Sequence, residues 1–223
     1  LLVVPAALGV PSAVRKIPLA PDSGWETAMT FLRDSTPDPL PNPRSGAGAA
    51  WSVLSWWDNG WTIARLGRRV PVTNPTQAGA AWAARALLSE DEAGALALLA
   101  EKKVAVIALD AALLDYSPPG FRFPAGQFGT LPVWAKADLA RYRVGVSFPS
   151  REGPRRTTFF LPPYFRTLAF RLWRHGGAAA SPAGPVLGVR LDSRGVARDA
   201  LRFPTYEAGR AFVASAGAGW SLA

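Results

Sequence analysis

Hydrophobic and polar positions follow helical and strand periods in turn along the first half of the chain. A capping box at Ser23 and Glu26 precedes apolar residues on one helical face: Trp25, Ala28, Met29 and Leu32. The apolar run from Trp51 to Trp57 has the length of a buried strand, and Asn59-Gly60 ends it because both residues tolerate positive φ. The pattern predicts a helix and then a buried strand.

Helical patterns follow this strand before a second strand pattern appears. The expected elements are a helix over 58–67, an extended piece over 70–73, a helix from Asn74-Pro75 to about Leu88, a helix after a capping box at Ser89 and Glu92, and a buried strand over 103–110. The order of strand, helices and strand favours parallel pairing.

The second half of the chain has a less regular pattern. It predicts a loop over 116–125, a strand over 142–148, a helix over 158–173, a strand pair over 185–192 and 196–203, and a final helix from the cap Thr205 to Val213. The expected fold is α/β of mixed α+β type. A central helix-rich α/β core carries the Trp-Trp-Asp segment at a strand end, and a smaller part at the C-terminus contains strands.

Length and composition fit one substantial core. The chain has 223 residues, of which 49% are hydrophobic and 18% charged. The first ten residues, LLVVPAALGV, are apolar but too short and too broken by Pro5 to span a bilayer. We expect residues 1–20 to be the tail of a preceding membrane segment or a linker, and 21–223 to form a single globular domain that is less regular from about 140.

Cysteine and histidine usage limits the possible chemistry. The sequence has no cysteine, which excludes disulfides and thiolate metal sites. Its one histidine, His175, precedes two glycines at an expected helix end, where a basic side chain meets the helix dipole favourably. We expect no metal site in this chain.

The net charge is +9 and the sequence pI is 10.8, which raises the question of a nucleic-acid partner. The basic residues are spread along the chain without a nucleic-acid motif, so we expect no nucleic-acid partner. Contact with anionic lipid headgroups or a lipid pyrophosphate is an alternative, and a solvated basic surface is favoured over both.

Trp56, Trp57 and Asp58 are the strongest candidates for a binding site. Each indole offers one N–H donor and an apolar face, and a carboxylate accepts, so the three can hold a hydroxyl group. The carboxyl ends of strands in open α/β sheets commonly border ligand sites. The structural alternative is two core tryptophans and an aspartate that caps the next helix.

The segment SWWDNGWTIARLGRRVPVTNPTQ, over 55–77, resembles the WWDYG signature region of the catalytic subunit of N-oligosaccharyltransferase. The likeness covers about residues 23–135, and Asn59 replaces the tyrosine of the signature. The resemblance implies transfer of a lipid-linked oligosaccharide to asparagine in Asn-x-Ser/Thr sequons. It further implies that Trp56, Trp57 and Asp58, with Asn59 and Gly60, bind the sequon hydroxyl.

The resemblance implies a second pocket element on a kinked helix. PAGQFGTLPVW is its best match and puts Gln127 and Leu131 at the two expected positions, although the lysine and aspartate of the common version are missing. The helical spacing of Phe128, Leu131 and Trp134 also fits an ordinary core-facing helix. We expect Phe128 and Trp134 to be core residues.

In the family, catalytic acids and the Mn²⁺ or Mg²⁺ ligands lie in a membrane-embedded region upstream of this domain. The resemblance therefore implies no catalytic residue here, an inactive isolated chain, and a domain on the extracytoplasmic side of a membrane. The implied partners are the acceptor polypeptide, the lipid-linked donor and the membrane region. The alternative function is a non-catalytic carbohydrate- or peptide-binding module that uses exposed tryptophans.

Overall fold

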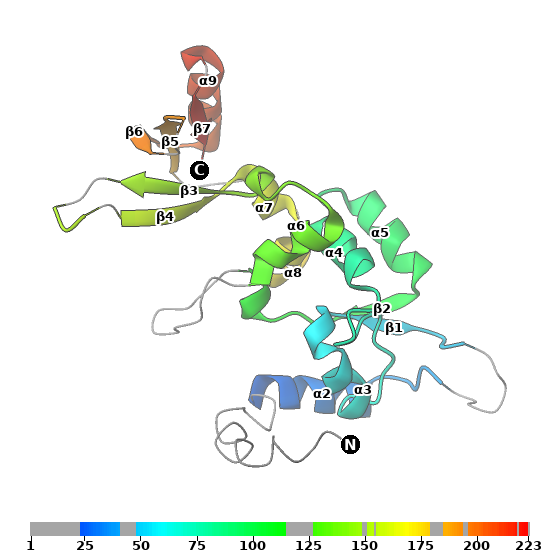
Figure 1. Ribbon diagram of the computed structural model, residues 1–223. Coiled ribbons are helices and arrows are strands. Elements are labelled where there is room, and N and C mark those ends of the chain that lie inside the picture. The colour runs from blue at the N-terminus through cyan, green and yellow to red at the C-terminus, as the bar shows by residue number, and fades with distance from the viewer. Residues whose placement is uncertain are drawn as a thin grey trace, which may run out of the picture. The chain divides into compact units, whose positions relative to one another are not determined.

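The structure is a computed structural model that describes residues 23–40, 48–114, 127–148, 151–153, 155–178, 185–193, 196–217 and 219–222. Its contacts divide the chain into two compact units: Leu1–Ala78 with Lys103–Ile107, and Gly79–Lys102 with Ala108–Ala223. Helices and strands are mixed in both, so the predicted α/β class is confirmed (Figure 1). Within the described ranges, every helix is too short or too polar to cross a membrane. The expected tail at 1–20 and loop at 116–125 lie outside these ranges.

The first unit contains the predicted N-terminal helix and the predicted motif strand. Its elements are α2 (Ser23–Ser35), β1 (Ser52–Leu54), the 3-10 helix η1 (Trp57–Asn59), α3 (Gly60–Arg65) and β2 (Val104–Ile107). Met29 and Leu32 of α2 are buried, whereas Ala28 is exposed, so the buried face is narrower than the sequence pattern predicts.

Strand β1 lies between two parallel neighbours. On one side it pairs with β2, where Val53 lies opposite Val106. On the other side the Val53 N–H donates to the Val70 carbonyl at 2.8 Å, and the Val72 N–H donates to the Val53 carbonyl at 2.9 Å. The expected parallel pairing is confirmed. All three residues of β1 are buried, as is typical of strands in parallel sheets, whose faces are covered by other elements.

Arg69 connects α2 to the extended piece beside β1. Its side chain is 6% exposed and lies at the C-terminal end of α2. The guanidinium donates to the carbonyl of Arg33 at 2.9 Å and to the Thr36 hydroxyl at 2.8 Å, and it lies 5.7 Å from the Trp51 ring centroid. A cation here satisfies carbonyls that the helix end leaves unpaired and complements the helix dipole.

The second unit combines a helical part with two antiparallel sheets. Its helices are α4 (Ala80–Leu88), α5 (Glu92–Glu101), η2 (Ala111–Leu114), η3 (Gln127–Gly129), α6 (Thr130–Ala135), η4 (Leu139–Arg141), α7 (Pro162–Arg166), α8 (Leu168–His175) and α9 (Tyr206–Ala216). Its strands are β3 (Arg143–Phe148), β4 (Arg155–Phe160), β5 (Val186–Leu191), β6 (Ala197–Phe203) and β7 (Trp220–Leu222).

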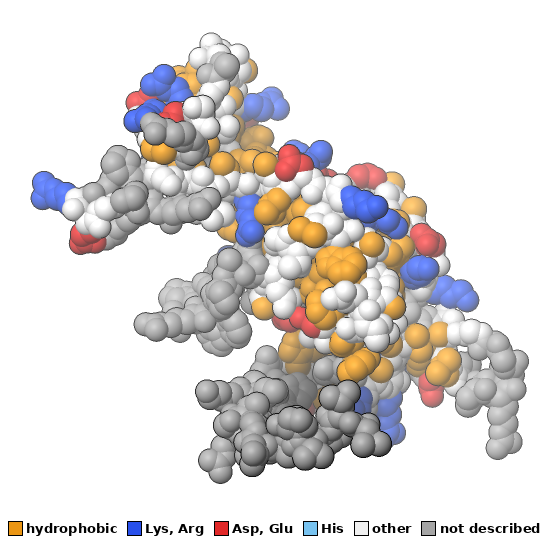
Figure 2. Space-filling view, viewed as in Figure 1, with side chains coloured by type: hydrophobic (Ala, Val, Ile, Leu, Met, Phe, Trp, Pro, Cys, Tyr) orange, Lys and Arg blue, Asp and Glu red, His pale blue; other side chains and the backbone are white. Residues whose placement is uncertain are grey.

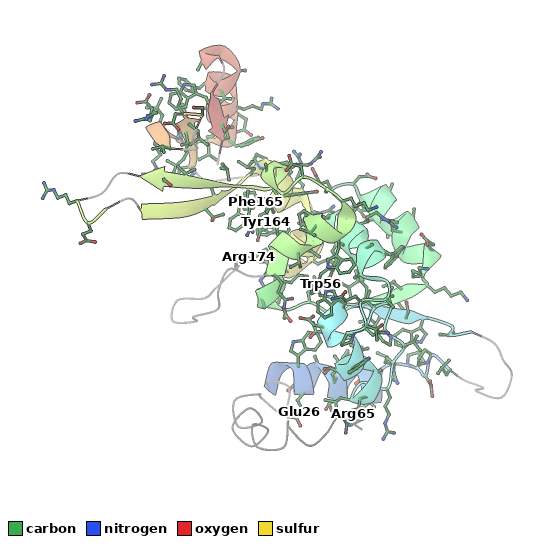
Figure 3. All side chains as sticks on the ribbon, in the orientation of Figure 1. Glu26, Trp56, Arg65, Tyr164, Phe165 and Arg174 are labelled. Carbon is green, nitrogen blue, oxygen red and sulfur yellow. The ribbon has the colours of Figure 1, made fainter. Side chains whose placement is uncertain are left out.

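An aromatic cluster forms the core of the helical part. Phe128 is fully buried, and its ring makes edge contacts with Tyr142 at 5.6 Å and Tyr164 at 4.7 Å between centroids. The Tyr164 hydroxyl donates to the Leu114 carbonyl at 2.5 Å. Figure 3 shows Tyr164 and its neighbour Phe165 in this cluster. The cluster therefore joins η2, η3 and α7.

Glu90 holds the corner between α4 and α5 with two arginines. Arg141 of η4 approaches one carboxylate oxygen at 2.8 Å, and Arg166 of α7 approaches the other at 2.9 Å. The carboxylate is mostly buried, while both arginines are half exposed. One acidic side chain thereby ties three elements of the unit together.

The C-terminal sheet has the order β6-β5-β7 and packs against α9 (Figure 1). The strand pair predicted around residue 194 is confirmed as β5 and β6, which pair antiparallel. Thr205 caps α9 by accepting from the Ala208 N–H at 3.2 Å, as predicted, and the helix continues three residues past Val213. Phe203, Phe212 and Trp220 fill the space between sheet and helix.

The helix predicted to begin at Asn74-Pro75 is wrong at its start. The Asn74 side chain instead accepts from the Thr76 N–H at 2.9 Å, which forms a local turn. Gln77 then has a φ of 66° and Gly79 a φ of 78°, neither of which continues a helix. Helix α4 therefore begins at Ala80.

Two further predicted boundaries are corrected by local chemistry. Asp91, not Ser89, caps α5, because the Asp91 carboxylate accepts from the Gly94 N–H at 2.6 Å. The predicted helix over 158–173 is instead the end of β4 followed by α7 and α8. The two prolines, Pro162 and Pro163, occupy the first positions of α7, where a missing N–H costs no helical hydrogen bond.

Candidate functional site

The Trp-Trp-Asp segment lies where β1 ends and the chain turns into a helix. The predicted strand reaches Trp57, but the observed strand ends at Leu54, and Trp57 begins the 3-10 turn η1. The turn closes where the Asn59 N–H donates to the Trp56 carbonyl at 3.1 Å, and α3 follows directly. The helix predicted over 58–67 is thus a 3-10 turn joined to a short α-helix.

The two tryptophans of the segment differ in exposure. Trp56 is 2% exposed, while Trp57 is partly exposed, and their ring centroids are 6.2 Å apart at 55° (Trp56 is labelled in Figure 3). The Trp57 Nε1–H is buried and has no hydrogen-bond partner among the described residues. Asp58 follows it in the same turn and is partly buried. A buried donor therefore stands beside a carboxylate at a strand end.

The turn is supported by side-chain hydrogen bonds among Ser55, Asn59 and Thr73. The Asn59 Nδ2 donates to the Ser55 Oγ at 3.3 Å, and the buried Thr73 hydroxyl donates to the Ser55 carbonyl at 3.0 Å. Ser55 and Thr73 were not among the candidates from the sequence. Their side-chain types carry no local signal of such a role, because the contact between them joins residues 18 positions apart.

Gly60 is required by packing. A Cβ at this position would overlap the Thr73 carbonyl oxygen and lie 2.5 Å from the Asn74 Cα. Its φ of −59° is ordinary helical geometry, so conformational freedom does not explain the glycine. The start of α3 is pressed onto the backbone of the segment beside β1, which sets where the turn can lie.

Gln127 and Leu131 belong to the second unit. Gln127 begins η3 and is partly buried, whereas Leu131 in α6 is fully buried. The 3-10 turn η3 runs into α6, so this segment is an irregular helix. Phe128 is a core residue as expected, and Trp134 is half-buried. The role of Gln127 and Leu131 in a pocket stays a prediction.

His175 and the charged side chains offer no competing centre within the described residues. His175 is exposed and is the last residue of α8, before Gly176 with a φ of 58°, as its sequence context predicts. The described residues contain no group of three His, Cys, Asp or Glu side chains that could hold a metal ion. Lys and Arg side chains are scattered among acidic ones over the visible face in Figure 2.

The first part of the chain matches a known protein family. Residues 22–113, which contain the whole Trp-Trp-Asp turn, match the AglB core domain model. This part of the chain is therefore similar to the AglB core-like family. The recognition of an oligosaccharyltransferase C-terminal domain from the tryptophan motif is therefore confirmed.

Two archaeal relatives show the same AglB relationship in sequence. The chain is 27% identical over 142 residues to dolichyl-phosphooligosaccharide-protein glycotransferase 3 of Archaeoglobus fulgidus, covering 53% of this chain and 15% of the relative. It is 30% identical over 125 residues to the glycotransferase AglB of Haloferax volcanii, covering 44% of this chain and 12% of the relative. The chain thus spans only a small part of the length of these relatives, which are glycosyltransferases.

Solved AglB structures share the fold. The C-terminal globular domain of an Archaeoglobus fulgidus oligosaccharyltransferase matches with a TM-score of 0.54 and 16% identity, over 84% of this chain and 99% of that domain. An AglB from the same organism, in complex with an inhibitory peptide and a dolichol-phosphate, matches with a TM-score of 0.53 and 22% identity, over 73% of this chain and 22% of its own. Another structure from that organism, with Zn and sulfate, matches with a TM-score of 0.52, 22% identity, and coverage of 73% and 25%.

Proposed function

We propose that this chain is the acceptor-recognition part of an oligosaccharyltransferase and that Trp56, Trp57 and Asp58 bind the hydroxyl of an Asn-x-Ser/Thr segment. The observation that carries the proposal is the buried Trp57 Nε1–H, which has no hydrogen-bond partner among the described residues. Leaving a buried donor unsatisfied costs about 1–3 kcal/mol. A ligand oxygen that accepts from this N–H would recover that free energy.

A hydroxyl group suits the two polar groups of the turn better than other small groups. It can accept from the Trp57 Nε1–H and donate its own proton to the Asp58 carboxylate. Asp58 lies next to Trp57 in η1, and Trp56 is buried behind them. A site of this kind discriminates against a side chain without a hydroxyl, because its own polar groups would then lose their partner.

The relatives support the same substrate classes for the complete protein. One AglB of known structure binds an inhibitory peptide and a dolichol-phosphate. We extend these classes to an acceptor polypeptide and a lipid-linked oligosaccharide donor, with this domain on the extracytoplasmic side of a membrane region. We propose that Mn²⁺ or Mg²⁺ and the transfer chemistry belong to the membrane region, as the resemblance implies. Asn59 and Gly60 are proposed as supporting residues of the acceptor site, while a pocket role of Gln127 and Leu131 stays what the resemblance implies.

The carbohydrate-binding alternative receives less support from the motif. Stacking on a sugar ring requires an exposed indole face, and Trp56 is 2% exposed. Trp61, one turn further along the chain, is 60% exposed and could serve such a role only outside the motif. Trp61 is therefore a suitable control residue.

The test compares acceptor peptides with Thr or Val two residues after the asparagine, using the complete protein and a lipid-linked donor. Trp57→Phe removes the indole N–H, and Asp58→Asn removes the carboxylate. We expect Asp58→Asn to lower kcat/KM for the Thr peptide by roughly 10-fold or more, the range for a hydrogen bond to a charged group, and Trp57→Phe to lower it by roughly threefold to tenfold, the range for a neutral one. The preference for the Thr peptide over the Val peptide should fall together with kcat/KM.

Trp61→Phe is the matched control and should leave transfer unchanged. Full transfer by both Trp57→Phe and Asp58→Asn at limiting peptide would show that the pocket assignment is wrong. Glycan binding that ignores the sequon would favour the carbohydrate-binding alternative instead.

A further inference from the structure

The turn that carries the candidate site is intrinsically weak. Trp57–Asn59 is a single 3-10 turn, and neither Trp56 at its start nor Asn59 at the start of α3 makes a side-chain capping hydrogen bond. Short 3-10 turns have poorer hydrogen-bond geometry than α-helices. The direction of the Trp57 indole and the Asp58 carboxylate must therefore be set by contacts that this turn makes with its surroundings.

We infer that Asn59 is a positioning residue, whose hydrogen bond to Ser55 holds Trp57 and Asp58 in the orientation that binds the acceptor. This inference rests on the proposed function of the pocket. The Asn59 Nδ2 donates to the Ser55 Oγ at 3.3 Å. The bond joins the residue just before Trp56 to the residue just after Asp58, so it closes a ring around all three functional residues.

Ser55 is a rigid anchor for this bond. It is 1% exposed, and its carbonyl accepts from the buried Thr73 hydroxyl at 3.0 Å. Thr73 in turn lies against Gly60, so the anchor and the start of α3 share one packed backbone segment. The Asn59 amide thus connects the turn to a buried and closely packed part of the unit.

A tyrosine at position 59, as in the WWDYG signature, has no amide to donate to Ser55. The asparagine therefore gives this chain its own way to hold the turn. A preorganised site loses less conformational entropy when the acceptor binds. The hydroxyl pocket does not touch the reacting amide, so loss of the bond should weaken acceptor binding more than the chemical step.

The experiment measures KM and kcat for an acceptor peptide with the complete protein and a lipid-linked donor. Asn59→Ala and Ser55→Ala each remove one partner of the bond. Each should raise the peptide KM by roughly threefold to tenfold, the range for one neutral hydrogen bond, with kcat changed less than about twofold. The double variant should match the single variants, because the same bond cannot be lost twice.

Asp38→Ala is the matched control. Asp38 makes a comparable local bond in the same unit, accepting from the Leu40 N–H at 2.8 Å, and lies outside the turn. An unchanged KM in Asn59→Ala, or additive effects in the double variant, would overturn the inference. If Asn59→Ala fails to fold, Ser55→Ala carries the test alone, since it removes only a hydroxyl.

The outcome separates this inference from the proposed function. If Asp58→Asn impairs transfer while Asn59→Ala and Ser55→Ala do not, the pocket stands and the positioning role of Asn59 is wrong. If Asp58→Asn and Trp57→Phe are both neutral, the pocket itself is wrong. A parallel fall in kcat and in thermal stability for Asn59→Ala, with KM unchanged, would mean that Asn59 is merely structural.

Discussion

Gly60 and Thr73 meet so closely that no side chain fits between them. A Cβ at position 60 would overlap the Thr73 carbonyl oxygen, and the Asn74 Cα would be 2.5 Å away. Both neighbours are backbone atoms, which cannot rotate aside. This contact presses the start of α3 against the segment that follows Arg69, and it explains the last residue of the tryptophan motif by packing.

The substitution Gly60→Ala tests that contact, because the contact decides whether the free energy of unfolding rises or falls. In a free helix the change would stabilise by about 1 kcal/mol, because alanine is the better helix former. Overpacking against backbone costs about 1–3 kcal/mol or more, so we expect a net loss of roughly 2 kcal/mol in urea unfolding. Gly48→Ala is the control, because a Cβ there meets no atom within 4 Å. Stabilisation by Gly60→Ala would contradict the contact.

Arg69→Met should destabilise the first unit. The substitution leaves the carbonyls of Arg33 and Thr36 at the end of α2 without their donor, at a cost of about 2–4 kcal/mol. Arg69→Lys should recover only part of this loss, since a lysine lacks the fork that reaches several acceptors. Thermal unfolding followed by tryptophan fluorescence measures the change. Arg65→Met, at an exposed position of α3, should be nearly neutral, and equal effects at the two positions would refute the role of Arg69.

Tyr164→Phe should weaken the helical part of the second unit. The variant keeps the aromatic ring but removes the donor to the Leu114 carbonyl, which leaves that buried acceptor unpaired at about 1–3 kcal/mol. Hydrogen exchange of the amides in η2 and α7 locates the effect. Tyr206→Phe, in the half-buried first position of α9, is the control. Unchanged exchange in η2 would contradict the assigned hydrogen bond.

Tyr142 should make stability depend on alkaline pH. Burial of its phenol, with a smaller contribution from the charge of Glu90, raises its pKa above the usual value of 10.0. The folded state therefore holds the phenolic proton more tightly than the unfolded state. The contribution of the Tyr142 phenol to the free energy of unfolding is fully present below about pH 10. It is lost as the pH rises through the raised pKa.

Urea unfolding between pH 8 and 11, a range that brackets roughly the normal tyrosine pKa, measures how the free energy of unfolding changes with pH. Tyr142→Phe should flatten the alkaline decline, because phenylalanine does not ionise. An identical decline in the variant would assign the pH dependence to other groups.

Local patterns predicted much of the fold. The capping box at Ser23 and Glu26 indicated α2, the apolar run around Val53 indicated a buried strand, and the Thr205 hydroxyl caps α9 as expected. Each of these signals acts within a few residues. The errors at Asn74 and Ser89 arose where other local hydrogen bonds, accepted by Asn74 from the Thr76 N–H and by Asp91 from the Gly94 N–H, competed with the predicted cap.

The sequence pointed to the tryptophan motif as a candidate site, but it did not reveal the residues that support this turn. Trp56, Trp57 and Asp58 carry their chemistry in their side-chain types, and the family relationship follows from the same residues. Ser55 and Thr73 became visible only when the fold brought them together across 18 positions. A serine and a threonine in extended segments have too many possible partners for sequence alone to choose one.

The sequence by itself determined most of the helices and strands, the resemblance to the family and the three residues of the candidate pocket. These depend on side-chain chemistry and on periods of two to four residues, both of which are local. Only the tertiary structure decided that the strand ends at Leu54, that Asn59 bonds back to Ser55, and that Gly60 leaves room for Thr73. The reason is physical, since these outcomes depend on where the backbone of residues 70–74 lies beside β1, and no local pattern specifies that distance.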